Sequence, residues 1–328
     1  MSKGLAALTQ RRLLIVTGKG GTGKTTVAAA LGLLAAREGI ITVVIEVGET
    51  DVLPRLLARK PKKLKWGAGR TPLRIAPHLF TLRIVPEVAL TEYLELQLHV
   101  RRIVRLVVGN QGFRRLLDAA PGWRALITLG KLWHLQSQTE RNEPRWPLLI
   151  VDGPSTGHGL SFLSVPNVVL DTVRLGPLRR HTDWVQALLK DASRTLVLPV
   201  AQPEELPVSE TVELCTRVRE LGMTLGPVIA NAVEPPADLP DLDAILAEVA
   251  RLPAADSTLL DPELLRECVE HRLRRTALQR VFLEKLEQQT GQPVIPLPYL
   301  ARAIDGPESL AALADHLAAG LASGEPES

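Results

Sequence analysis

The sequence predicts a single α/β domain with a doubly wound, mostly parallel sheet and an inserted helical subdomain. Three observations lead to this prediction. Short apolar runs alternate with helical stretches, a glycine-rich loop follows the first apolar run, and the middle of the chain carries helical patterning alone. Alternating strands and helices are typical of a parallel sheet, because each parallel connection needs a crossover. We expect one domain over residues 1–328, with the helical insertion at 86–145.

The first strand and helix enclose the glycine-rich loop. Residues 13–16 are an apolar run that stops at a glycine, and residues 25–37 form an alanine- and leucine-rich helix that ends before Gly39. Residues 41–45 are a second apolar run, rich in β-branched side chains. The two runs and the helix between them make a βαβ unit, so their strands are parallel.

The middle of the chain leaves the sheet and returns to it. Residues 60–74 are basic and rich in proline and glycine, which predicts an exposed loop. A short strand is expected at 79–85, followed by helices through 87–140. The apolar run 148–151 then returns to the sheet and ends on Asp152.

The C-terminal half continues the alternation of strands and helices. Its last residues are small and polar, so we expect them to be disordered. The expected elements are strands at 195–199, 228–230 and 294–297, helices at 264–289 and 310–321, and a disordered tail at 323–328.

Composition argues against several classes of function. The net charge is only +3 and aromatic residues make up 3% of the chain, so no nucleic acid is expected as a partner. No apolar stretch is long enough to span a bilayer, so we expect a cytoplasmic protein without stable membrane insertion. Cys215 and Cys268 are far apart in the sequence, which argues against a thiolate metal cluster.

The glycine-rich loop carries the strongest functional signal. It fits the phosphate-binding pattern G-x-x-x-x-G-K-[ST], in which backbone N–H groups and the start of the next helix face one anion. Lys24 is expected to reach the β- and γ-phosphates of ATP, and the Thr25 hydroxyl to bind Mg²⁺. The predicted nucleotide-binding residues of this P-loop are Gly18, Lys19, Gly20, Gly21, Thr22, Gly23, Lys24, Thr25 and Thr26.

An acidic residue stands at the end of the strand at 148–151. Asp152 is placed where a carboxylate must lie to hold the Mg²⁺ shell beside Thr25. The segment 152–158 reads Asp-Gly-Pro-Ser-Thr-Gly-His and is similar to the D-T-A-P-T-G-H switch II motif of the arsenite-pump and guided-entry ATPases. Its proline comes one place early, which leaves the path of the loop open. The residues that match the motif are Asp152, Thr156, Gly157 and His158.

Lys19 makes the P-loop unusual, because it directly follows the first glycine. The resulting pattern G-K-G-G-x-G-K-T-T resembles the deviant Walker A motif of the signature-lysine class of P-loop ATPases. The resemblance implies a sandwich dimer with two ATP molecules at its interface, formed with a second copy of the chain or with a paralogue. Lys19 would cross this interface and offset charge on the partner's transferring phosphoryl group.

Weaker similarities to the same arsenite-pump family run from about residue 13 to residue 317. Residues 203–211 resemble the family's P-E-x-x-P-x-x-E-T helix start. Asn231 matches the asparagine that reads adenine, and Pro298 belongs to a segment that resembles the one packing on the base. The resemblance therefore adds Asn231 and Pro298 to the predicted nucleotide site.

The loop after the second strand departs from the family. The family has D-P-A-H there, followed by an aspartate that orients the attacking water, whereas this chain has Glu-Val-Gly-Glu-Thr-Asp at 46–51. Asp51 is our first candidate for orienting the water, since it lies furthest into the loop, and Glu46 and Glu49 are the alternatives. Glu46 could instead contact Mg²⁺ through water. The predicted catalytic residues are thus Lys19, Lys24 and Asp51, with slow hydrolysis as one expectation.

Together these features predict an ATPase that couples nucleotide state to dimer closure and to a protein or membrane client. The apolar residues of the insertion fit either a client groove or the packed core of a buried helix. These residues are Leu90, Leu94, Leu98, Ile103, Val107 and Val108.

Three rival functions stay open. A ParA/MinD-type positioning ATPase is disfavoured by the segment 156–158 and by the large insertion. A pseudo-ATPase that binds ATP without turnover is favoured by the altered segment 46–51. Metalloid transport is disfavoured because the chain lacks the cysteine triad of the arsenite pumps.

Overall fold

The computed structural model describes residues 3–48, 52–59, 69–98, 110–119, 122–235 and 262–323, together with the single positions 104, 106, 108, 244 and 247. Asp51 and Glu49 lie outside this part of the chain, as do the loop at 60–68 and the candidate groove residues Ile103 and Val107. For Leu98 only the backbone is described.

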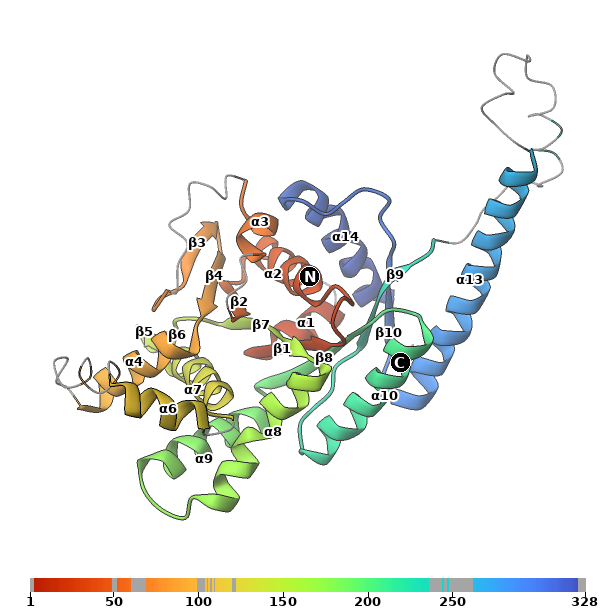
Figure 1. The fold of residues 1–328 in the computed structure, drawn as a ribbon. Coiled ribbons are helices and arrows are strands. Elements are labelled where there is room, and N and C mark those ends of the chain that lie inside the picture. Colours follow the sequence, from red (N-terminus) through yellow and green to blue (C-terminus); the bar gives the residue numbers. More distant parts are fainter. Residues whose placement is uncertain are drawn as a thin grey trace.

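An eight-stranded sheet forms the centre of the described molecule (Figure 1). The strand order is β10-β9-β8-β1-β7-β2-β4-β3, and all neighbouring pairs are parallel except β3 with β4. This confirms the predicted mostly parallel α/β sheet. The strands are β1 (Leu13–Gly18), β2 (Thr42–Val47), β3 (Leu73–Ala76), β4 (Leu79–Ile84), β7 (Leu148–Ser155), β8 (Thr195–Ala201), β9 (Val228–Val233) and β10 (Val294–Pro298).

Helices cover both faces of this sheet, because alternate residues of each central strand point to opposite sides. Leu14 and Val16 of β1 belong to one hydrophobic core, and Leu13 and Ile15 belong to the other. The first core is covered by α1 (Lys3–Thr9), α2 (Lys24–Arg37), α3 (Leu53–Leu57) and α14 (Pro307–Ser323). The second is covered by α7 (Trp123–Ser137), α8 (Thr156–Thr172), α9 (Pro177–Lys190), α10 (Glu205–Glu220) and α13 (Pro262–Thr290).

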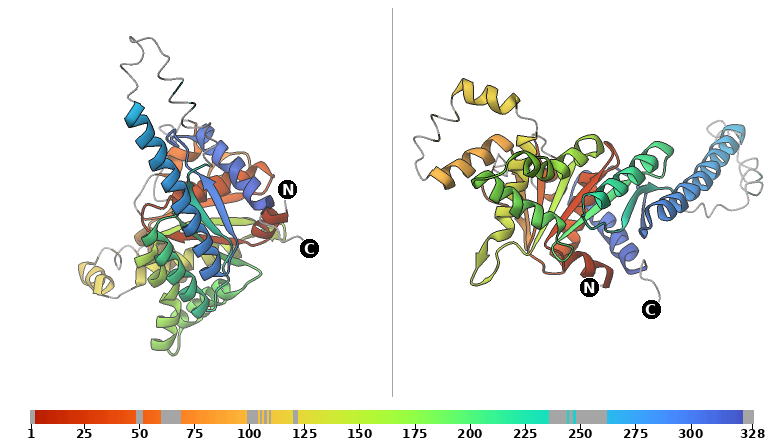
Figure 2. Two further views of the ribbon diagram at one scale, coloured as in Figure 1. Left: turned by 90° about the vertical axis from the view of Figure 1, so that its right-hand side faces the viewer. Right: turned by 90° about the horizontal axis from the view of Figure 1, so that it is seen from below.

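Three helices extend the second layer outward (Figure 2). Helix α4 (Pro86–Leu98) packs on α7, and α6 (Gln111–Ala119) lies near them. Helix α13 packs on α10, β9 and β10 with its C-terminal part, and its N-terminal part projects away from the sheet. Among the described residues, none of the helices combines the length and the apolarity needed to cross a bilayer.

The structure corrects two strand boundaries. Strand β7 does not end on Asp152 but continues through Ser155. Strand β3 begins at Leu73, inside the predicted exposed loop, because this segment pairs antiparallel with β4 at the edge of the sheet. Helix α1 was not predicted; its Leu5 and Leu8 are buried in the first core.

The predicted helical insertion is helical only in part. It ends in a hairpin of β5 (Thr139–Glu140) and β6 (Glu143–Pro144), whose turn residues Arg141 and Asn142 both have positive φ, as in the tight turns that suit hairpins. At the other end of the chain, α14 ends at Ser323, the first residue of the predicted tail, and residues 324–328 of that tail lie outside the described part of the chain. The division of the chain into one domain with an insertion at 86–145 stays a prediction.

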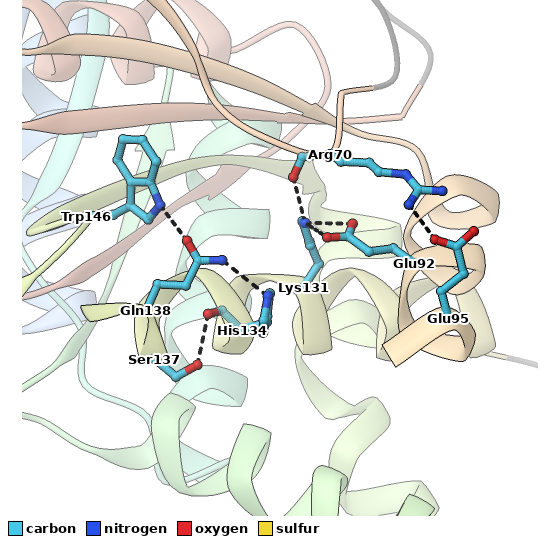
Figure 3. Close-up of polar contacts among 8 residues, drawn as sticks. All are labelled: Arg70, Glu92, Glu95, Lys131, His134, Ser137, Gln138 and Trp146. Atoms are coloured by element: carbon cyan, nitrogen blue, oxygen red, sulfur yellow. Dashed lines mark hydrogen bonds and ion pairs between the residues drawn. The ribbon is translucent and has the colours of Figure 1, made fainter. Parts of the chain in front are cut away.

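A buried ion pair fixes α4 against α7 (Figure 3). The Lys131 ammonium donates to both carboxylate oxygens of Glu92 at 2.7 Å and to the backbone oxygen of Arg70 at 2.8 Å. Just past the end of α7, Gln138 donates to His134 Nε2 at 3.2 Å and accepts from Trp146 Nε1 at 3.0 Å. Burial and the nearby Lys131 charge lower the pKa of His134. These contacts join α4 to α7, and they join the end of α7 to Trp146, which lies just before β7.

Candidate functional site

The P-loop lies between the end of β1 and the start of α2, at the carboxyl ends of the parallel strands. Gly18 and Gly23 are required there by close contacts as well as by backbone conformation. A Cβ on Gly18 would lie 2.1 Å from the Val200 oxygen, and one on Gly23 would lie 2.2 Å from Asn231 Nδ2. Their φ values are 152° and 90°, which side-chain-bearing residues rarely adopt.

Hydrogen bonds hold the P-loop in a closed turn. The buried Thr22 hydroxyl donates to the Lys19 backbone oxygen at 2.9 Å, and Lys24 Nζ donates to the same oxygen at 2.8 Å. Asn231 Nδ2, from β9, donates to the Thr22 backbone oxygen at 2.9 Å. The structure therefore brings Asn231 to the P-loop, although the two are more than 200 residues apart.

Lys24, Thr25 and Asp152 form the polar centre of the site. The Thr25 hydroxyl donates to Asp152 Oδ2 at 2.5 Å, which joins the start of α2 to β7. Burial raises the pKa of Asp152 to about 6, against the opposing effects of the Thr25 hydrogen bond and the Lys24 charge. Burial likewise lowers the pKa of Lys24, while Asp152 raises it. The side chains of Lys24 and Asp152 are thus both partly desolvated.

The oxygen atoms at this point suit a hard divalent cation. Asp152 Oδ1 is buried and accepts no hydrogen bond from any of the residues that the structure describes. Carboxylate and hydroxyl oxygens are the protein ligands that Mg²⁺ prefers, directly or through water. The Thr25 and Asp152 side chains therefore fit the Mg²⁺ role expected from the sequence.

Glu46 is a further carboxylate at the site. It lies near the end of β2, in register with Asp152 on the neighbouring strand β7, and its side chain is buried. Its Oε1 accepts a hydrogen bond from the Val52 backbone N–H at 3.1 Å, and its charge contributes to the raised pKa of Asp152. Sequence reasoning ranked Glu46 below Asp51, because it weighed distance into the loop rather than strand register.

The altered switch II segment continues β7 instead of forming a free loop. Ser155 pairs with Gly18 across a register shift, and the Thr17 hydroxyl donates to the Pro154 backbone oxygen at 3.3 Å. A Cβ on Gly153 would lie 2.7 Å from the Val16 oxygen, so the strand passes too close to β1 for a side chain there. Helix α8 begins at Thr156, directly after Ser155, the last residue of β7.

The remaining predicted residues lie around this centre. Lys19 points to α10, where its Nζ forms an ion pair with Glu210 Oε1 at 2.8 Å. Pro298 ends β10 and pairs in register with Val233, two residues beyond Asn231. Gly20, Gly21 and Thr26 complete the P-loop and the first turn of α2.

Comparison with known proteins decides the family. The model of the anion-transporting ATPase (ArsA ATPase) family matches residues 11–181, more than half of the chain. The chain belongs to this family. The ATPase BagA of Mycobacterium tuberculosis is 30% identical over 319 residues, which cover 90% of this chain and 89% of that protein.

More distant members of the anion-transporting ATPase family also match. An ATPase ASNA1 homolog of Entamoeba dispar is 24% identical over 70% of this chain and 78% of its own length. The ATPase GET3C of Arabidopsis thaliana is 21% identical over 71% of this chain and 70% of its own length. The chain is accordingly a nucleotide-binding ATPase that converts ATP and water to ADP and phosphate.

The crowding of Gly23 in this ATPase gives a first testable prediction. Gly21 has a similar φ of 87° but open space around its Cα, so Gly21→Ala measures backbone strain alone. We expect Gly21→Ala to lower the free energy of unfolding by about 1–2 kcal/mol. Gly23→Ala should lower it by about 2–4 kcal/mol, since it also displaces Asn231 and breaks its hydrogen bond. Urea unfolding without nucleotide measures both; equal losses would contradict the described contact.

Proposed function

We propose that the chain is an ATP-driven dimer switch that couples nucleotide state to a protein client with an apolar segment. The observation that carries the proposal is the different direction of the two P-loop lysines. Lys24 turns into its own loop and donates to the Lys19 backbone oxygen, whereas the Lys19 ammonium turns outward to α10. These directions support a role for Lys24 at the protomer's own nucleotide and a role for Lys19 at the nucleotide of a second protomer.

The proposed partner in the switch is a second copy of this chain. Leu206 is 60% exposed and lies one helical turn before Glu210 on α10, the residue that pairs with the Lys19 ammonium. A second protomer that receives Lys19 at this point would also remove the apolar surface of Leu206 from water. A paralogue with the same P-loop is the alternative partner.

Hydrolysis is proposed to rest on the polar centre around Asp152. Lys24 would bind the β- and γ-phosphates, and Thr25 and Asp152 would hold Mg²⁺. When bound, Mg²⁺ would supply positive charge that offsets the negative charge of the phosphates. Asp152 would then be fully ionised, because a divalent cation outweighs the burial that raises its pKa. Asn231 and Pro298 would position the adenine.

The carboxylate that orients the attacking water is proposed to be Glu46. It lies beside Asp152 at the strand ends, where the γ-phosphate is expected. Its hydrogen bond to the Val52 N–H links it to the segment that follows residues 49–51. Asp51, the candidate favoured by the sequence, lies outside the described residues and stays a prediction.

Apolar surface on the outer helices supports the client part of the proposal. Leu90 and Val108, two of the predicted groove residues, line one cavity of about 330 Å³ together with Phe113, Leu117 and Trp123. Val168 of α8, Leu178 of α9 and Leu175 in the connection between these helices are exposed, and Leu175 is 88% exposed. Exposed leucines and a neighbouring cavity are suited to an apolar helix from another protein.

Replacing Lys19 with alanine tests the switch. We expect Lys19→Ala to bind Mg·ATP as the wild type does, because Lys24 remains. Self-association in Mg·ATP and turnover per protomer should both fall at least about tenfold, since a point charge on the partner's phosphates is lost. Sedimentation velocity and phosphate release measure the two effects.

The same proteins test the client. A fluorescent apolar helical peptide should bind the wild type with an affinity that changes on adding Mg·ATP, and Lys19→Ala should show no such change. Equal peptide affinity in all four conditions would remove the client from the proposal. Unchanged self-association and turnover in Lys19→Ala would remove the dimer switch.

A further inference from the structure

We infer that Glu210 is a positioning residue that holds Lys19 within its own protomer until a nucleotide-bound partner takes the lysine over. The inference deepens the proposed function and rests on it, because it assigns a regulatory partner to the lysine that acts between protomers. Glu210 lies in the segment 203–211, whose resemblance to the family suggested a helix start but no role for this carboxylate.

The contact itself is specific and close. Lys19 Nζ lies 2.8 Å from Glu210 Oε1, and the two side chains are 27% and 32% exposed. Glu210 stands on a fixed support, because Thr211, Leu214 and Val218 of α10 are buried against the sheet. Lys19 has a flexible four-carbon stem, so the lysine is the partner that moves.

The backbone of Lys19 is also fixed in place. Its carbonyl oxygen accepts hydrogen bonds from the Thr22 hydroxyl and from Lys24 Nζ, at 2.9 and 2.8 Å. Only the Lys19 side chain is therefore left to swing when a partner approaches. The Lys19 ammonium can pair either with the single negative charge of Glu210 or with the several negative charges of a triphosphate on the partner.

Because the two anions compete, the position of the Lys19 side chain depends on whether the partner protomer holds ATP. Without ATP, Glu210 neutralises the ammonium and reduces its repulsion from Lys24 in the same loop. A triphosphate on the partner offers more negative charge and outcompetes the carboxylate. Closure is then favoured when the partner holds ATP and is opposed when its site is empty. Glu210 thereby acts as a latch: it sets how much negative charge the partner's nucleotide must carry before the dimer closes.

The size of the effect follows from the strength of such pairs. Partly exposed ion pairs change an equilibrium by up to about fivefold. A symmetric dimer contains two Lys19–Glu210 pairs, and both break when it closes. Their effects on the dimerisation equilibrium therefore multiply to at most about 25-fold. An ordinary surface ion pair with no part in closure would leave the dimer affinity unchanged.

The test is a double-mutant cycle on the full-length protein. Glu210→Gln should tighten self-association in Mg·ATP by about 2- to 25-fold, measured by sedimentation velocity across a protein dilution series. The protein concentration at half-maximal ATPase activity should fall by the same factor, while kcat stays unchanged. Glu210→Gln in the Lys19→Ala background should have no effect. Glu220→Gln is the control, because it removes a charge and the exposed pair with Arg217 from the same helix.

The outcomes separate the two proposals. If Lys19→Ala matches the wild type, the dimer switch fails and the latch fails with it. If Lys19→Ala weakens association but Glu210→Gln leaves it unchanged or weakens it, only the latch fails. An equal tightening in Glu220→Gln, or in the Lys19→Ala background, would also overturn the latch, because the effect would then come from net charge.

Discussion

Replacing Lys24 with alanine is expected to weaken ATP binding strongly while leaving the fold intact. Lys24 is the lysine that turns into the P-loop, and its ammonium is already partly desolvated, as its lowered pKa shows. Removing one partner of a desolvated charge pair weakens binding by about 2–5 kcal/mol, which corresponds to about 30- to 4,000-fold. Isothermal titration calorimetry with Mg·ATP measures the loss.

The control for Lys24→Ala is Lys19→Ala, which removes the same charge from the same loop. Lys19→Ala should keep its ATP affinity. Both variants should unfold in urea like the wild type. For Lys24 the reason is that its ammonium makes one hydrogen bond in the loop, while its burial disfavours the charged form and so adds little to the stability of the fold. Wild-type affinity in Lys24→Ala would overturn the assignment of the P-loop. A large loss in Lys19→Ala would show that both lysines serve one nucleotide.

Glu46→Gln is expected to lower kcat by a factor of about 10²–10⁴, the usual contribution of a positioned general base. Glutamine keeps the oxygen that accepts from the Val52 N–H, so the buried side chain stays in place. ATP affinity should change little, because the ground state does not need the base. The variant should therefore accumulate as the ATP-bound form. Single-turnover phosphate release and equilibrium ATP binding measure the two quantities separately.

The acidic residues at 49 and 51 provide matched variants. Asp51→Asn and Glu49→Gln remove the same charge from the same segment. Full activity in both, with an inactive Glu46→Gln, assigns the water to Glu46. The reverse pattern returns the role to Asp51, the residue that the sequence favoured. A Glu46→Gln variant that also loses Mg²⁺-dependent ATP affinity would instead indicate contact with the Mg²⁺ shell.

The centre of the candidate site can be proposed from the sequence because its residues lie in one contiguous loop or near the end of an apolar strand. The P-loop is one contiguous segment, and its chemistry can be recognised without a fold. Asp152 was placed by the rule that parallel strands end at the ligand, and the Thr25 contact at 2.5 Å agrees with that placement. The central strands were predictable for a similar reason, since buried parallel strands are continuous apolar runs.

Contacts between distant segments could not be predicted in this way. Glu46 lies next to Asp152 because β2 pairs with β7 in that register, and a local sequence pattern does not reveal how two strands are paired. The ion pair of Lys19 with Glu210 joins residues almost 200 positions apart. The hairpin β5–β6 was missed because its strands are two residues long, too short for an alternating pattern. Asp152 also seemed to end its strand, because Gly153 and Pro154 are residues that usually interrupt one.

The continuation of β7 into α8 joins the candidate site directly to the exposed apolar side chain near the far end of that helix. Three residues separate Asp152 from the first residue of α8, and Pro154 and Ser155 are attached to β1 rather than to a flexible loop. A helix of 17 residues is about 25 Å long, so a tilt of about 10° at its start would move its far end by about 4 Å. Val168 stands near that far end. Such a tilt would displace the exposed apolar side chain of Val168 by about the width of a methyl group.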